Sequence, residues 1–189
     1  ERIRTVDPNH LISFRCCDAG LPTAVSKTSS YYDFSSFCGA LDFVSPEGYG
    51  FTSYQYNASS YEGAFAEAYA RLVSGPVPTV WKEFGWSVWG GSNDVPKQSN
   101  LDYCGKVYRK VYDAVLLGQG GGTYSWWYTG GLRPGGGSDY GVVGPDGSDR
   151  PASLAVREYA AKMKALVPAG AKEADVIFTV DRDLYANGL

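Results

Sequence analysis

Histidine is almost absent from this chain of 189 residues, which contains one, His10. Zinc sites and histidine-based triads need histidine in a defined cluster, and the cysteines form no Cys-x-x-Cys pair that would replace it. The four cysteines are Cys16, Cys17, Cys38 and Cys104. We therefore expect His10 to lie in a turn within residues 7–10, the cysteines to be free thiols, and the protein to use no metal and no other cofactor.

Long apolar runs and clusters of positive charge are also missing. No stretch approaches the roughly 20 apolar residues that cross a bilayer, so we expect no membrane partner. The 17 Lys and Arg residues against 20 Asp and Glu residues leave a net charge of −3. Nucleic-acid affinity depends on clustered cations, which excludes nucleic acid as an expected partner. Residues 1–4, ERIR, carry no apolar signal-peptide core, so the compartment is not readable from the chain directly.

Glycine and aromatic residues are abundant instead, with 24 Gly, 15 Tyr and 5 Trp, which predicts tight loops and aromatic surfaces. Hydrophobic patterning predicts four strands, at residues 11–16, 41–45, 79–84 and 123–128. It also predicts helices at residues 61–73, 101–117 and 151–167, whereas the segment 19–39 should contain a helix but is poorly periodic. Strands that alternate with helices in this way predict an α/β fold with a parallel sheet.

Helical spacing predicts which faces of the first two helices are buried. In residues 61–73 the expected buried residues are Ala64, Phe65, Ala68, Tyr69 and Leu72, with Glu67 and Arg71 mostly off that face. In residues 101–117 they are Val107, Tyr108, Val111, Tyr112 and Val115. Ligands of parallel α/β sheets gather at the carboxyl ends of the strands, which directs attention to residues 15–18, 45–49, 83–86 and 126–131.

Five segments of the chain resemble a known family in the right order. The segment 78–85, PTVWKEFG, is similar to the seventh strand of the clan A glycoside hydrolase barrels, which delivers a nucleophilic glutamate. The segments 6–13 and 41–45 are similar to their fifth and sixth strands, and TYSWWY at 123–128 to their eighth. The segment 139–147, followed by Arg150-Pro151, resembles the lead into the last helix. The resemblance covers about residues 1–167.

The resemblance implies the C-terminal half, strands five to eight, of a (β/α)₈ TIM barrel, with Glu83 as the nucleophile of a retaining mechanism. It implies that Tyr49 donates a hydrogen bond to the nucleophile, although a plain loop tyrosine is the alternative. Glu47 stands where relatives often have a histidine, and we interpret it as a substrate-contacting or loop residue. The family's acid/base follows an asparagine, and no Asn-Glu pair occurs in this chain. A part outside this chain is therefore expected to supply it.

Aromatic residues near the predicted strand ends are candidate sugar platforms. Trp126 and Trp127 should point to opposite faces if the strand is regular, so one of them would face the barrel mouth. Trp86 or Trp89 could line a neighbouring subsite, with core packing as the alternative for each tryptophan. Arg133 and Asp139 could hydrogen-bond sugar hydroxyls or simply solvate a loop.

The functional expectation is retaining hydrolysis of β-glycosidic bonds in a polysaccharide or oligosaccharide. The alternative is a non-catalytic carbohydrate-binding barrel fragment. Residues 168–189 are expected to be a linker and the first strand of a following β-rich domain. Half a barrel leaves sheet edges and apolar surface open, so we expect either the other half of the barrel or another chain as a partner. The resemblance implies an extracellular or periplasmic location.

Overall fold

The computed structural model describes residues 2–17, 38–47, 62–89, 96–117, 120–132 and 138–166. Strands and helices alternate along these residues, with a short 3₁₀ turn, η2, before the second strand. The elements are α1 (Arg2–Val6), β1 (Ser13–Cys17), η2 (Cys38–Ala40), β2 (Phe43–Glu47), α3 (Glu62–Ser74), β3 (Trp81–Phe84), α4 (Gln98–Leu117), β4 (Thr123–Ser125) and α5 (Pro151–Leu166). All four predicted strands and all three predicted helices are present, so the α/β prediction is confirmed.

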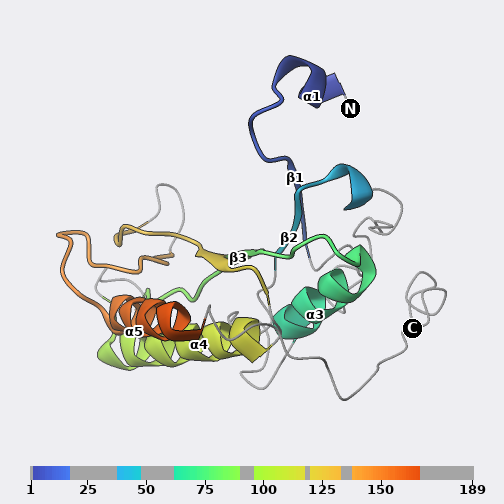
Figure 1. Cartoon of the computed structure of the whole chain (residues 1–189). Coiled ribbons are helices and arrows are strands. Elements are labelled where there is room, and N and C mark those ends of the chain that lie inside the picture. Colours follow the sequence, from blue (N-terminus) through green and yellow to red (C-terminus); the bar gives the residue numbers. More distant parts are fainter. Residues whose placement is uncertain are drawn as a thin grey trace, which may run out of the picture.

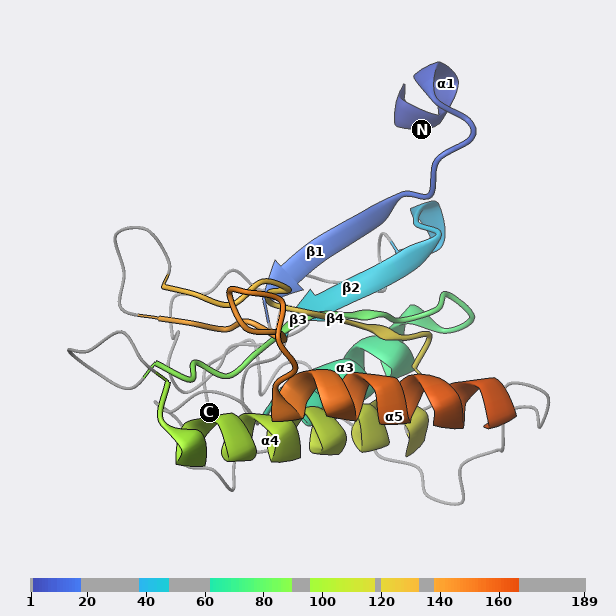
Figure 2. The same cartoon turned by 90° about the vertical axis from the view of Figure 1, so that its left-hand side faces the viewer.

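The strands form one parallel sheet in the order β1-β2-β3-β4. Phe14 lies opposite Val44, and Glu47 lies opposite Glu83, so the first three strands run in register to their carboxyl ends. Figures 1 and 2 show α3, α4 and α5 along one side of this sheet, while α1 projects beyond the start of β1. Arg4 of α1 reaches back to Asp42, with 2.9 Å between Nη2 and Oδ2.

The larger core cluster joins β3 to α4 and α5. Trp81 and Phe84 of β3 are buried against α4, where the rings of Phe84 and Tyr108 lie 4.9 Å apart. All five residues predicted for the buried face of α4 are buried, and they are Val107, Tyr108, Val111, Tyr112 and Val115. The helix begins at Gln98, three residues before the predicted start at Leu101.

The predicted buried face of α3 is wrong at three positions. Glu67 is 4% exposed, whereas Ala68 and Leu72 are exposed. The physical reason is a tertiary contact, because Glu67 accepts a hydrogen bond of 2.8 Å from the Thr79 hydroxyl just before β3. Burial raises the pKa of Glu67 to about 7, although the Thr79 hydrogen bond and the charge of Arg71 act in the opposite direction.

The scarce residue types occupy the places that their sequence contexts suggest. The side chain of Asp7 accepts hydrogen bonds from the backbone of Asn9 and His10 and contacts the His10 ring, which confirms a turn. Cys38 and Cys104 are buried free thiols, as predicted. Within the described ranges, no group of three or more His, Cys, Asp or Glu residues is placed to hold a metal ion.

No helix in the described part of the chain is long and apolar enough to cross a membrane. Residues 18–37, which cover most of the segment predicted to contain a further helix, lie outside the described residues. Residues 168–189 do so as well, and the second domain stays a prediction.

Candidate active site

The carboxyl ends of β1, β2 and β3 bring three charged side chains together. In the parallel register Arg15 lies opposite Ser45 and Cys17 opposite Glu47, and Glu47 in turn lies opposite Glu83. Arg15 therefore stands two residues behind the two glutamates, at a distance that its long side chain can span. Because parallel strands end at the same edge of a sheet, residues 32 and 68 positions apart in sequence become neighbours.

Arg15 connects the two glutamates directly. Its Nε donates a hydrogen bond to Oε1 of Glu47, and its Nη2 donates one to Oε2 of Glu83 at 2.8 Å. The side chains of Glu47 and Glu83 are 7% and 13% exposed, whereas that of Arg15 is 52% exposed. One guanidinium thus lies between two sheltered carboxylates and offsets the repulsion that two like charges would otherwise have at this separation.

The bonds from Arg15 do not by themselves separate the roles of the two carboxylates. Ionised and protonated carboxyl groups both accept hydrogen bonds, whereas a nucleophile must be ionised and a general acid must carry a proton. The interpretation of Glu83 as the nucleophile, and of Glu47 as a substrate-contacting or loop residue, therefore stays a prediction.

The tryptophan pair follows the sheet at the neighbouring strand end. The backbone N–H of Trp126 donates to the carbonyl of Phe84, the residue after Glu83, at 2.7 Å. The rings of Trp126 and Trp127 lie 5.5 Å apart, are tilted by 41°, and are each partly exposed. The peptide bond between them is cis. These contacts place an aromatic pair beside the strand end that carries Glu83.

The orientation predicted for Trp126 and Trp127 assumed a regular strand, and the structure differs. Strand β4 ends at Ser125, so the two tryptophans do not alternate along a regular strand as predicted. Trp126 still bonds to β3, but from Trp127 onward the backbone also pairs with a second segment, because Val142 donates to the carbonyl of Trp127 and Val143 to that of Tyr128, each at 3.1 Å. The backbone of the pair is therefore held by both β3 and residues 142–143.

Trp86 lies among core side chains. Its ring centroid is 4.6 Å from that of Tyr103 on α4, and its indole nitrogen is enclosed. Trp86 therefore packs against the core, which was one of the two interpretations of this residue. Its role in a sugar subsite stays a prediction. Tyr49 and Arg133 lie outside the described residues, and their predicted roles remain predictions too.

Asp139 is placed where it cannot serve as the predicted sugar contact. Its side chain is 4% exposed, and its two carboxylate oxygens accept hydrogen bonds from Arg150 at 3.0 and 2.8 Å. Burial alone would raise the pKa of Asp139, but the hydrogen bonds from Arg150, Gly141 and Gly131 outweigh it and leave the pKa lowered. The carboxylate is thus an internal partner of an arginine.

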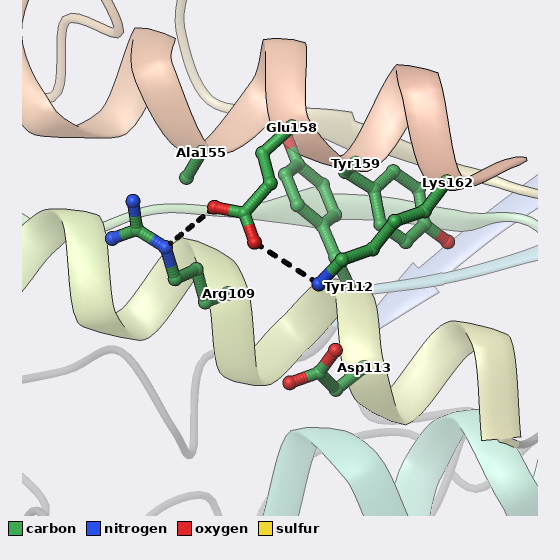
Figure 3. Close-up of a pocket in the computed structure, with 7 residues that line it drawn as sticks. All are labelled: Arg109, Tyr112, Asp113, Ala155, Glu158, Tyr159 and Lys162. Atoms are coloured by element: carbon green, nitrogen blue, oxygen red, sulfur yellow. Dashed lines mark hydrogen bonds and ion pairs between the residues drawn. The ribbon is translucent and has the colours of Figure 1, made fainter.

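A small pocket lies elsewhere, between α4 and α5 (Figure 3). Arg109 and Lys162 both contact Glu158 at 3.0 Å across it, and the rings of Tyr112 and Tyr159 stack at 4.2 Å. Its cavity volume is about 10 Å³, room for about one water molecule. It contains none of the candidate site residues and is too small for a sugar.

Two arginines that organise this end of the sheet were not assigned a role from the sequence. Arg15 falls within the strand-end segment 15–18, and that position is the signal that points to it. Arg150 precedes the last helix by one residue, and nothing local distinguishes its buried guanidinium from a solvated one. Only the folded chain places it beside Asp139.

No protein-family model and no curated protein matches the chain. The fold is similar to xylanase 10B from Thermotoga petrophila RKU-1, solved in complex with xylobiose, with a TM-score of 0.58 and 14% identity. It is also similar to a β-glucuronidase from Ruminococcus gnavus and to a β-galactosidase from the psychrophilic Marinomonas ef1, each with a TM-score of 0.56 and 15% identity.

The matches cover most of this chain but only part of each similar protein. They cover 84%, 82% and 90% of this chain, but 49%, 28% and 26% of the xylanase, the β-glucuronidase and the β-galactosidase respectively. This chain thus spans about half of the first protein and about a quarter of the other two. The predicted fold is confirmed: the chain has the fold of part of a TIM barrel.

Proposed function

We propose that this chain carries the nucleophile of a retaining β-glycosidase, and that the nucleophile is Glu83. The observation that carries the proposal is the position of this carboxylate at the carboxyl end of β3. There it is sheltered, held by Arg15 at 2.8 Å and adjacent to the residue that bonds to Trp126. The similarity in fold to three glycosidases supports the same function.

The residues present account for one half of a double displacement. The Glu83 carboxylate attacks the anomeric carbon, the bond to the leaving oxygen breaks, and a covalent glycosyl ester forms. A second carboxyl group protonates the leaving oxygen and afterwards takes a proton from the water that cleaves the ester. In this proposal that group comes from outside this chain, and Tyr49 and Arg15 keep Glu83 oriented.

The proposed substrate is a β-linked polysaccharide or an oligosaccharide derived from one. Trp126 and Trp127 would offer a flat apolar face to a pyranose ring, with Glu47, Trp86 and Arg133 as further proposed contacts. The described cluster of Arg15, Glu47 and Glu83 carries a net charge of 1 − 2 = −1 when all three are ionised. Such a cluster favours a neutral sugar over an anionic one at the adjacent position.

A mechanism-based inactivator tests the proposal in the full-length protein. A panel of 2-deoxy-2-fluoro β-glycosides, including xyloside, galactoside, glucuronide and glucoside, would be incubated with the protein and followed by peptide mass spectrometry. We expect stoichiometric attachment of one fluorosugar to the peptide that contains Glu83. The Glu47→Gln variant should still be labelled there, whereas the Glu83→Gln variant should not.

Two outcomes would overturn the proposal. Turnover of a β-glycoside with labelling at a carboxylate other than Glu83 would remove Glu83 as the nucleophile. Tight oligosaccharide binding with neither turnover nor labelling would favour the non-catalytic carbohydrate-binding alternative.

A further inference from the structure

The loop that holds the tryptophan pair is itself organised by a buried ion pair. The side chains of Arg150 and Asp139 are 7% and 4% exposed. Nη1 and Nη2 of the arginine donate to separate oxygens of the aspartate, and Nη1 donates in addition to the carbonyl of Gly141 at 3.0 Å. The backbone N–H of Gly141 completes the set with a 2.9 Å bond to Asp139.

The arginine end of this pair is anchored to a helix. Arg150 immediately precedes α5, its backbone N–H donates to the Ser153 hydroxyl at 3.0 Å, and its carbonyl accepts from Leu154. These are the bonds of a capped helix N-terminus, so the guanidinium extends from a fixed point. The helix in turn packs through Ala152 and Ala155 into the larger core cluster.

The aspartate end is connected to both loops that border the candidate site. The carbonyl of Asp139 accepts from the backbone N–H of Val88, after β3, at 2.7 Å. Three residues later, Val142 donates to the carbonyl of Trp127. The carboxylate also accepts from the backbone of Gly131, which follows the tryptophan pair. Asp139 therefore contacts the segment after β3 through its main chain and the segment after β4 through its carboxylate.

The close approach of backbone to guanidinium explains a glycine at this point. A Cβ on Gly130 would lie 2.4 Å from the carbonyl oxygen of Val143 and 2.7 Å from Nη2 of Arg150. Both distances are too short for carbon contacts, so a side chain there would displace the Val143 backbone and the arginine. The guanidinium thus occupies the space next to the backbone that follows Trp127.

We propose that the Asp139–Arg150 ion pair positions the tryptophan pair, Trp126 and Trp127, and that it thereby sets the affinity for sugar without contacting the sugar. A buried pair of this kind costs desolvation, and two apolar residues of similar volume are often as stable. What an apolar pair cannot do is make the directional bonds that join the backbone at Gly131 and Gly141 to the start of α5. The sugar-binding part of the inference rests on the proposed function.

The test compares Arg150→Lys and Arg150→Met with a matched control, Arg157→Met. Arg157 lies on the same helix and is paired with Asp149, but the two side chains are 60% and 53% exposed. Lysine keeps the charge and loses the two-pronged geometry. Near-ultraviolet circular dichroism would report the tryptophan pair, with Trp126→Phe/Trp127→Phe defining its share of the signal. Oligosaccharide binding and the KM and kcat of hydrolysis would be measured on the same full-length proteins.

For Arg150→Lys we expect an unchanged far-ultraviolet spectrum, a loss of the tryptophan-pair signal and a rise of about tenfold in KM or Kd, with kcat changed far less. Arg157→Met should match the wild type. An Arg150→Lys protein with wild-type tryptophan signal and affinity would overturn the inference. So would equal losses in kcat and in folded fraction without a change in KM, since those indicate a purely structural role. If the wild type binds no sugar, the proposed function fails, and the tryptophan signal alone then decides the positioning role.

Discussion

Glu47 and Glu83 lie directly opposite each other on adjacent parallel strands, and the guanidinium of Arg15 bonds to both. Two carboxylates so placed would repel each other without a counterion. The arginine turns the pair into a stable arrangement with one net negative charge. The proposed function assigns unequal roles to these two glutamates, although Arg15 bonds to both.

The two glutamates should respond differently to the same substitution. Glu83→Gln removes the nucleophile and should lower kcat by about a thousandfold or more, whereas Glu47→Gln should lower it far less. Binding of an oligosaccharide should survive both changes, measured by isothermal titration calorimetry. Added azide offers a control: with Glu83→Gly it should form a glycosyl azide of inverted configuration. Larger losses from Glu47→Gln than from Glu83→Gln would reverse the assignment.

The role of Arg15 can be separated from a general structural role with a double-mutant cycle. Arg15→Met leaves two like charges facing each other, so we expect a loss of about tenfold or more in kcat/KM. Glu47→Gln in the Arg15→Met background removes one of those charges and should recover part of the loss. Additive effects of the two substitutions would show that Arg15 does not act through this charge pair.

Glu67 should make stability depend on pH near neutrality. Its folded-state pKa of about 7 exceeds the ordinary value of 4.5, so the folded chain binds the proton more tightly than the unfolded chain. Stability is then highest below about pH 4.5 and falls as pH rises to about 7, by on the order of 3 kcal/mol from this group.

Urea unfolding of Glu67→Gln between pH 4.5 and 8 measures this contribution. Glutamine keeps the contact with Thr79 and does not titrate. The free energy of unfolding of the variant should therefore not fall between pH 4.5 and 8 as that of the wild type does. The difference between variant and wild type cancels the contributions of the ionisable groups that the two proteins share. Asp113→Asn, at an exposed position on α4, is the matched control and should keep the wild-type profile. A parallel decline in wild type and Glu67→Gln would refute the assignment.

Gly105 should not tolerate alanine although it lies inside a helix. Alanine is normally favoured over glycine in a helix interior by about 1 kcal/mol. Here a Cβ would meet Pro151 at 2.7 Å, where α5 begins against α4. We expect Gly105→Ala to destabilise the fold by about 1–3 kcal/mol in thermal or urea unfolding.

Gly39 provides the comparison, because a Cβ there meets nothing within 4 Å. Gly39→Ala should leave the free energy of unfolding within about 0.5 kcal/mol of the wild type. Equal stability of the two alanine variants would mean that α4 and α5 do not approach each other at Gly105.

Local sequence patterns were sufficient to predict the strands and the long helices of this fold. Short apolar runs between turn residues identified the four strands of the described residues, and the 3.6-residue period identified the three long helices, because burial of one face imposes that period on a helix. The buried face of α4 followed from the spacing of Val107, Val111 and Val115. The face of α3 did not, since the hydrogen-bond partner of the buried Glu67 is Thr79, twelve residues away and just before β3.

By itself, the sequence determined the strand and helix order, the parallel α/β class and the strand end at which Glu83 stands, since all of these depend on neighbours along the chain. Only the tertiary structure decided which side chains meet. It placed Arg15 between two glutamates, buried Asp139 against Arg150 and ended β4 before the tryptophans. These contacts join residues from separate strands and loops. Their energies depend on burial and geometry that exist only after the elements have packed.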